Sequence, residues 1–102
     1  MPEVRSAREW VQLAFSQHWA IGQFNVSNLE TIQAVTRAAR ACRAPVFVGT
    51  SMGTIRYAGL AYLAVMVRVA KSEAEVPVFL HLDHGEGLDV INACLEMGCM
   101  TR

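Results

Sequence analysis

The sequence predicts an α/β fold in which an N-terminal helix precedes three βα units of parallel sheet. Strand-like apolar runs begin near residues 20, 45 and 76, and a stretch with helical spacing follows each run. An interval of about 25 to 30 residues suits a strand with its crossover helix and loops. Two runs, PVFVG and VPVFL, are apolar throughout, as is typical of parallel strands covered on both faces. With 102 residues, the chain is predicted to form a single domain over residues 1–102.

The first elements begin at recognisable capping signals. Residues 6–9 (SARE) have the S-x-x-E form of a capping box, so a helix is predicted from Ala7 to Gln17. Residues 20–26 (AIGQFNV) form the first predicted strand, and residues 27–30 (SNLE) repeat the capping form directly after it, which makes the serine the expected helix cap. The helix that follows is expected to bury one apolar stripe, made of Leu29, Ile32, Val35, Ala39 and Cys42.

The second and third units repeat this order of strand and helix. Residues 45–49 form the second predicted strand, which a short polar turn joins to a helix from about Arg56 to Glu73. Residues 76–82 form the third predicted strand. A third helix is predicted from Leu88 to Met97, and Gly98 is expected to end it.

Composition excludes several kinds of partner and location. Nine basic and nine acidic residues give zero formal net charge without a basic run, so neither nucleic acid nor an anionic membrane surface is an expected partner. The longest apolar stretch, Tyr57 to Val67, is far shorter than the about 20 residues that span a bilayer. The N-terminus has no apolar signal core, which predicts a cytoplasmic protein. The cysteines lack CxxC spacing and are expected to be reduced and buried: Cys42, Cys94 and Cys99.

Polar side chains occur where each predicted strand ends. Loops at the carboxyl ends of parallel strands gather on one side, where ligands bind in open sheets and in closed barrels alike. Asn25, Ser51 and the stretch HLDH at residues 81–84 occupy these positions. Each has a simpler interpretation as well, since Asn25 could bond its own turn and Ser51 could start the next helix.

The stretch HLDHG is harder to explain by structure alone. His81, Asp83 and His84 follow an apolar strand, and burying ionisable groups without partners is costly. Strand geometry places His81 and Asp83 on one face, and a bend at Gly85 would turn His84 toward the same place. Imidazole is a good zinc ligand, and a neighbouring carboxylate can transfer protons. A structural cluster of hydrogen-bonded side chains is the alternative that the spacing leaves open.

Three blocks together resemble a known family: AIGQFNVSNLETIQAV, APVFVGTSMGTIRYAG and VPVFLHLDHGEGLDVINACLEMG. In this order they resemble the class II, zinc-dependent fructose-bisphosphate and tagatose-bisphosphate aldolases. The resemblance implies a partial TIM (β/α)8 barrel, of which this chain would be the N-terminal segment. It implies that Asp83 is the catalytic acid/base, His84 a zinc ligand, Ser51 a contact of the phosphorylated substrate, and Asn25 a residue near the pocket. His81 belongs to the motif without being a ligand.

The activity that the resemblance implies is the reversible aldol cleavage of fructose or tagatose 1,6-bisphosphate, a lyase step of glycolysis and gluconeogenesis. The products would be dihydroxyacetone phosphate and glyceraldehyde 3-phosphate. A complete barrel takes about 250 residues, and catalytic zinc takes about three protein ligands, so the resemblance places the other two histidines beyond Arg102. The chain alone is therefore expected to bind zinc weakly and to turn over little or nothing. The alternative is a noncatalytic fragment that forms homo-oligomers or associates through open sheet edges.

Overall fold

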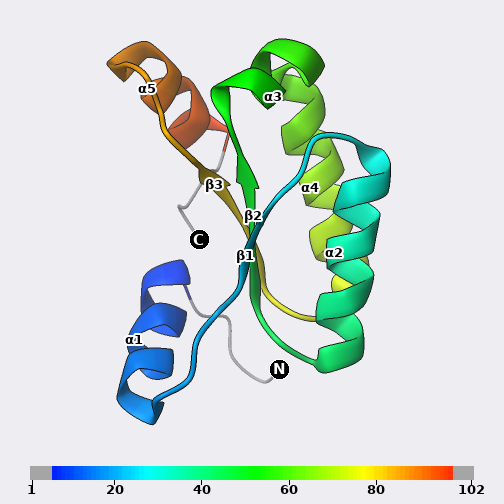
Figure 1. Ribbon diagram of the computed structural model, residues 1–102, viewed down its shortest axis with the longest axis vertical. Coiled ribbons are helices and arrows are strands. Elements are labelled where there is room, and N and C mark those ends of the chain that lie inside the picture. Colours follow the sequence, from blue (N-terminus) through cyan, green and yellow to red (C-terminus); the bar gives the residue numbers. More distant parts are fainter. Residues whose placement is uncertain (1–5, 98–102) are drawn as a thin grey trace.

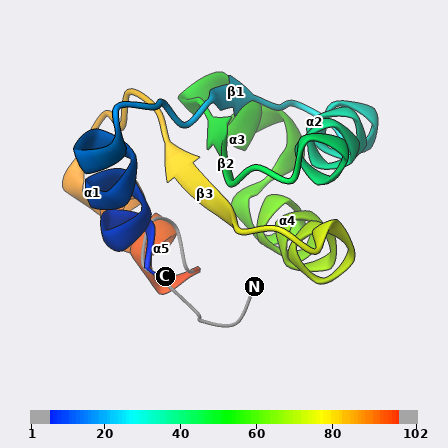
Figure 2. The ribbon, with the colours of Figure 1, turned by 90° about the horizontal axis from the view of Figure 1, so that it is seen from below.

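A computed structural model describes residues 6–97 of the chain as a parallel sheet with helices on both sides (Figures 1 and 2). The sheet has three strands in the order β1-β2-β3, and both neighbouring pairs are parallel. This confirms the predicted α/β class, with an N-terminal helix followed by βα units. The elements are α1 (Ala7–Gln17), β1 (Gln23–Asn25), α2 (Leu29–Cys42), β2 (Val46–Thr50), α3 (Met52–Ala58), α4 (Leu60–Ala74), β3 (Val78–Leu82) and α5 (Leu88–Glu96).

The capping box at α1 is confirmed, whereas the predicted cap of α2 is wrong by one residue. The Ser6 hydroxyl accepts a hydrogen bond from the Glu9 backbone N–H at 3.1 Å, and the Glu9 carboxylate accepts one from the Ser6 N–H at 3.0 Å. At α2 the cap is Asn28 rather than Ser27, because the Asn28 Oδ1 accepts from the Thr31 N–H at 2.9 Å. An amide side chain caps as well as a hydroxyl, so the two adjacent residues compete for the position.

The single helix predicted from Arg56 to Glu73 is two helices in the structure. Ser51 caps α3, since its Oγ accepts from the Thr54 N–H at 3.3 Å, and helix therefore begins inside the stretch predicted as a polar turn. Gly59 separates α3 from α4 with a φ of 86°, a backbone conformation that glycine adopts without steric cost. The chain thus changes direction at the carboxyl edge of the sheet before α4 returns along it.

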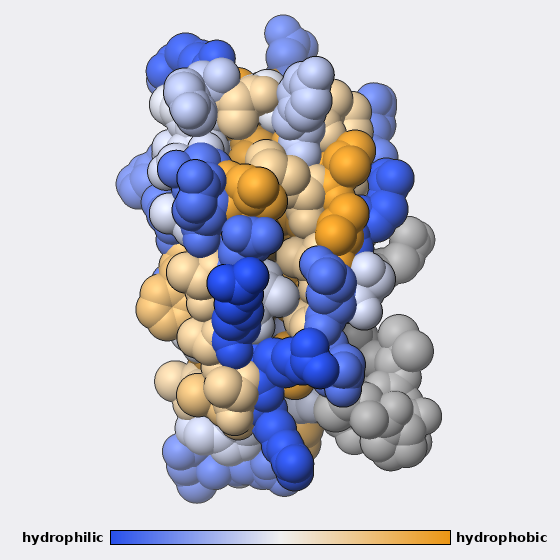
Figure 3. Space-filling view, turned by 90° about the vertical axis from the view of Figure 1, so that its right-hand side faces the viewer, coloured by the Kyte–Doolittle hydropathy of each residue, from blue (hydrophilic) through white to orange (hydrophobic). Residues whose placement is uncertain are grey.

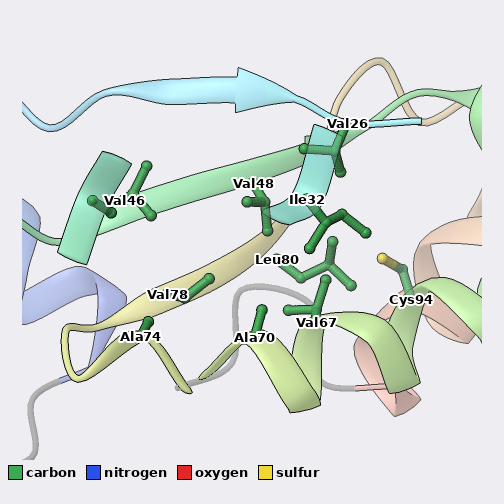
Figure 4. Packing of buried hydrophobic residues seen from close by; sticks show 11 residues of the cluster. Val26, Ile32, Val46, Val48, Val67, Ala70, Ala74, Val78, Leu80 and Cys94 are labelled. Carbon is green, nitrogen blue, oxygen red and sulfur yellow. The ribbon is translucent and has the colours of Figure 1, made fainter. Parts of the chain in front are cut away.

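The main core lies between one face of the sheet and helices α2 and α4 (Figure 4). In α2, Ile32 and Ala39 of the predicted stripe are buried and Val35 is partly buried, whereas Leu29 and Cys42 at the helix ends are exposed. The predicted apolar stripe is therefore correct at its centre and too long at both ends. The buried core residues are Val26, Ile32, Ala39, Val46, Val48, Val67, Ala70, Ala74, Val78, Leu80 and Cys94.

A smaller core lies on the opposite face, where α1 covers the sheet. Trp10 of α1 packs in one cluster with Phe47 and Phe79, whose ring centroids are 5.5 Å apart. The strand register aligns Gln23 with Phe47 and Phe47 with Phe79, so these side chains share a face. Asn25 lies on the same face but toward the carboxyl end, where it is exposed. The predicted burial on both faces therefore holds for the amino end of this face and not for its carboxyl end.

Figure 3 shows the outer surface of α2 and α4, where apolar side chains lie between charged ones. A groove between these helices has a volume of about 280 Å³. Its lining includes exposed Leu29, Val65 and Val69 together with Arg37 and Glu73. This surface is amphipathic rather than uniformly polar.

The cysteines do not form the reduced and buried set that the sequence predicted. Cys42 is free and exposed. Cys94 is buried, as expected, but takes part in a disulfide. Cys99, like Gly98 at the predicted end of the third helix, lies outside the described residues. None of the helices in residues 6–97 has the length and apolar character that crossing a membrane requires.

Thr50 at the end of β2 gives a first testable prediction. Its side chain is fully buried, and within the described residues its Oγ1 has no hydrogen-bond partner. A buried polar group without a partner costs about 1–3 kcal/mol, and valine has nearly the same shape. We expect Thr50→Val to raise the free energy of unfolding by about 1 kcal/mol in urea titrations. The matched control is Thr36→Val, because the buried Thr36 hydroxyl donates to the Ile32 carbonyl at 2.7 Å. A loss of stability in Thr50→Val would contradict the expectation.

Candidate active site

The ends of the three strands bring the predicted site residues to one edge of the sheet. Asn25 is the last residue of β1, Ser51 follows β2 directly, and Asp83 follows β3 directly. Backbone pairing continues just past the strand ends, since the Asp83 N–H donates to the Thr50 carbonyl at 2.8 Å. The parallel register therefore fixes where these residues lie (Figure 1).

Asn25 and Asp83 are in direct contact, although they are 58 positions apart in the sequence. The Asn25 Nδ2 donates a hydrogen bond to the Asp83 Oδ2 at 3.3 Å. The Asp83 side chain retains 31% of its accessible surface. The carboxylate is thus held through one oxygen and still open to solvent, which suits a group that exchanges a proton with a bound substrate.

His84 lies beside Asp83 with an open imidazole ring. Its Nε2 is 3.8 Å from the Asp83 Oδ1, and 90% of the side chain is exposed. The sharp bend occurs at His84 itself, whose φ is 57°, rather than at Gly85 as the sequence suggested. A left-handed conformation costs a residue with a Cβ about 1–2 kcal/mol. The helix C-caps His18, Arg43 and Glu75 have the same conformation, so it marks a turn, and at His84 this turn leaves the imidazole exposed.

His81 has a different environment from His84. It pairs in register with Gly49, and its ring meets the Phe47 ring edge-on with centroids 6.4 Å apart. Its Nδ1 is buried, and no hydrogen-bond partner for it occurs among residues 6–97. His81 therefore packs toward the small core under α1, in the face that it shares with Asn25.

Ser51 lies at this edge of the sheet because it directly follows β2. Among the described residues, its side chain makes hydrogen bonds to Thr54 rather than to Asn25 or Asp83. Its Oγ lies 3.3 Å from both the backbone N and the Oγ1 of Thr54, at the start of α3. The side chain is partly buried. Ser51 thus caps the start of the helix, as its simpler interpretation suggested, and its hydroxyl keeps either one lone pair or its proton for a ligand, depending on which hydroxyl donates in the contact with Thr54.

Gln23 contacts Asn25 and was not predicted as a site residue. The Gln23 Nε2 donates to the Asn25 Oδ1 at 2.6 Å. A Cβ atom added to Gly49 would overlap both the Gln23 Nε2 and the Asn25 Oδ1, so glycine on the neighbouring strand makes room for the pair. Strand alternation carried the signal, because Gln23 precedes Asn25 by two positions and must share its face.

The sequence also gave no sign of an ion pair at the rim of this edge. Arg56 Nη2 in α3 lies 2.9 Å from Glu86 Oε1 in the segment before α5. Both side chains are more than half exposed, so the pair contributes little to stability. It does link the segments that follow β2 and β3.

The described residues fit part of a zinc site. The exposed imidazole of His84, with a carboxylate at its side, suits one nitrogen ligand. Among residues 6–97, however, no group of three or more histidine, cysteine, aspartate or glutamate side chains could hold a metal ion. Catalytic zinc takes about three protein ligands, so this part of the chain does not form a complete metal centre.

Comparison with known proteins identifies the family of the chain. The family model described as fructose-bisphosphate aldolase class-II matches residues 5–101. The chain belongs to this class II aldolase family. It is 43% identical over 96 residues to the fructose-bisphosphate aldolase of Streptococcus pneumoniae serotype 4, covering 91% of this chain and 32% of that protein. The Geobacillus stearothermophilus aldolase is 37% identical over 98 residues, with 91% and 33% covered. The chain thus spans about a third of the length of these class II aldolases.

Solved aldolase structures match the same segment. The YdjI aldolase of Escherichia coli K12 superposes with a TM-score of 0.86 at 29% identity, covering 95% of this chain and 38% of that one. A putative fructose-1,6-bisphosphate aldolase of Coccidioides immitis gives 0.79 at 34% identity, covering 91% and 33%. The open sheet corresponds to the N-terminal part of an aldolase TIM barrel, which confirms the expected partial barrel.

Proposed function

We propose that the chain is the N-terminal segment of a class II ketose-bisphosphate aldolase and contributes part of the active site of a complete barrel. The reaction is the reversible cleavage of fructose or tagatose 1,6-bisphosphate to dihydroxyacetone phosphate and glyceraldehyde 3-phosphate. The observation that carries the proposal is the contact of Asn25 with Asp83, with His84 alongside, at the carboxyl edge of an aldolase-type sheet. Residues 1–102 act in this proposal as one structural unit of that barrel.

Asp83 is the proposed acid/base of the reaction. In cleavage, its carboxylate takes the proton from the C4 hydroxyl as the C3–C4 bond breaks, and a proton delivered to C3 from outside the described residues completes dihydroxyacetone phosphate. In condensation, C3 loses that proton and Asp83 returns its own to the C4 oxygen. Asn25 occupies the Oδ2 atom, so Oδ1 is the oxygen left for this exchange. Zinc, when bound, supplies Lewis-acid stabilisation of the negative charge that cleavage leaves on the dihydroxyacetone phosphate half.

In this scheme the remaining site residues bind the metal and the substrate. His84 supplies one zinc ligand, and ligands from outside the described residues complete the set. The Ser51 hydroxyl contacts the phosphorylated substrate, which its place directly after β2 supports. In this proposal the protein is cytoplasmic and its reaction belongs to glycolysis and gluconeogenesis. No nucleic acid or membrane partner is proposed for a chain with zero formal net charge.

A chimeric enzyme tests the proposal. Residues 1–102 replace the matching segment of the pneumococcal aldolase, to which this chain is 43% identical. We expect the purified chimera to cleave fructose 1,6-bisphosphate, to lose activity with a chelator, and to regain it with zinc. A second chimera that carries only residues 76–97 serves if the first misfolds. A folded chimera that binds zinc but does not cleave the substrate would contradict the proposal.

The backbone at His84 gives a separate prediction, in which stability and metal binding change in opposite directions. Glycine adopts a φ of 57° without strain, while it loses more backbone entropy on folding than histidine does. The net expectation for His84→Gly is a free energy of unfolding about 0.5–1 kcal/mol higher, together with a loss of zinc affinity. Urea denaturation of the chain and zinc titration of the chimera measure the two effects. Weaker stability with intact zinc binding would contradict the assignment of His84.

A second candidate function is that of a noncatalytic module that associates with copies of itself. The observation that favours it is that, within residues 6–97, β1 and β3 each pair on one side only. Unpaired strand edges are templates for further pairing. Sedimentation velocity of the chain tests this function: concentration-dependent oligomers support it, and a monomer throughout contradicts it.

A further inference from the structure

A line of hydrogen bonds reaches Asp83 from a residue that is outside the proposed reaction. Gln23 Nε2 donates to Asn25 Oδ1 at 2.6 Å, and Asn25 Nδ2 donates to Asp83 Oδ2 at 3.3 Å. Gln23 and Asn25 are two positions apart on β1, while Asp83 follows β3. The line therefore crosses the sheet on the face opposite to the main core.

The chemistry of these groups gives the line one direction. An ionised carboxylate only accepts hydrogen bonds, so the Asn25 amide must present its NH₂ group to Asp83. The Asn25 carbonyl oxygen then faces Gln23, and Gln23 must present its own NH₂ group in turn. If Gln23 presented its oxygen instead, that oxygen would face the Asn25 carbonyl oxygen, and this repulsion would favour a flip of the Asn25 side-chain amide.

Gly49 is the part of the sheet that allows this line. It lies on β2, in register with Asn25 on one side and His81 on the other. A Cβ atom at this position would overlap the two atoms that form the Gln23–Asn25 bond. The absent side chain therefore leaves space for the amide pair.

We propose that Gln23 is a positioning residue of the site: it fixes the Asn25 amide so that Asn25 holds Asp83 Oδ2 and leaves Oδ1 for the substrate. This proposal rests on the proposed function for its catalytic consequence. Gln23 itself does not contact the reacting atoms in this scheme. Its effect passes through Asn25, and Gly49 provides the room.

Two substitutions at Gln23 separate hydrogen-bond direction from packing. Gln23→Glu keeps the size and replaces the donor by an acceptor, whereas Gln23→Leu removes the donor and adds no acceptor. If the direction of the hydrogen bond matters, Gln23→Glu is more harmful than Gln23→Leu, although glutamate is closer in shape to glutamine. If Gln23 only fills space, Glu is the milder change.

The first readout is NMR spectroscopy of the labelled chain itself, which needs no activity. We expect cross-peaks between the Asn25 side-chain NH₂ protons and the Asp83 Hβ protons in the wild type. They should be lost in Gln23→Glu and weakened in Gln23→Leu. Gly49→Ala should lose them too, although Gln23 is present. The control is Gln12→Glu, an exposed position on α1, which should keep them. Cross-peaks that persist in Gln23→Glu would overturn the proposal.

The second readout is steady-state kinetics of the chimera with the same variants. Misplacing a catalytic group by about 1 Å can cost about 100-fold in rate, so we expect kcat to fall about 10- to 100-fold in Gln23→Leu and further in Gln23→Glu. KM should change little, because Gln23 does not bind substrate. Equal kcat values in all variants would overturn the catalytic part of the proposal. An inactive wild-type chimera would instead contradict the proposed function, and the NMR result would still decide the positioning of Asn25.

Discussion

Replacing Asp83 by asparagine in the chimera is expected to lower kcat about 100- to 10,000-fold with little change in KM. Asparagine has the same shape and can still accept the hydrogen bond from Asn25 through its carbonyl oxygen. It cannot take a proton from the C4 hydroxyl, so the loss should appear in the chemical step. Initial rates of fructose 1,6-bisphosphate cleavage over a range of substrate concentrations give both constants.

The matched control for this substitution is Asp89→Asn. Asp89 is exposed in the first turn of α5 and outside the proposed site. The same chemical change there should leave kcat unaltered, with at most a small loss of stability at the helix start. An Asp83→Asn chimera with the wild-type kcat would show that the acid/base is another residue.

The 102-residue chain by itself is expected to show no aldol cleavage above the uncatalysed background, whereas the chimera is expected to be active. The reason is the metal centre, because residues 6–97 contain no group of three or more side chains that could hold zinc, and catalytic zinc takes about three protein ligands. Zinc titration measured by isothermal calorimetry should give weak binding for the chain and tight binding for the chimera. Both proteins are assayed with the same zinc concentration and the same substrate.

An isolated chain that cleaves the substrate at the rate of the chimera would contradict this expectation. The His84→Ala variant of the chain is the control for its weak zinc binding. If His84 is the ligand, the variant should lose the residual binding. Binding that is equal in both would assign the metal to other side chains.

The sequence predicted the fold well where the signal was local and repeated. Apolar runs before Asn25, Ser51 and Asp83 marked three parallel strands, and each strand end carried a polar residue. The capping box at α1 was also right, because one pair of side chains satisfies both of its bonds. Local patterns of this kind depend on neighbours within a few residues, which the sequence shows directly.

The errors occurred where neighbouring choices had similar energies or where tertiary structure decided. Ser27 and Asn28 are both good caps, and in the structure Asn28 takes the position. The helical pattern continues through Gly59, so the break there depends on a positive φ that the pattern does not show. Leu29 and Cys42 belong to the apolar stripe but lie at the ends of α2, where they are exposed.

The site was predictable as a place and not as a set of contacts. Strand ends indicated that Asn25 and Asp83 share an edge, but the hydrogen bond between them depends on the register of three strands. Gln23 was overlooked because it lies two positions before the end of its strand, although strand alternation places it on the same face as Asn25. Metal ligands from outside the described residues cannot be inferred from this segment by physical reasoning alone.

The most direct test is a crystal structure of the zinc-loaded chimera with diffraction data collected on both sides of the zinc absorption edge. The anomalous signal locates the metal without assumptions about its ligands. We expect zinc bound to the imidazole of His84, with the Asp83 carboxyl group facing the same cavity and Asn25 on its other oxygen. Zinc bound elsewhere, with His84 turned away from it, would refute the proposed site.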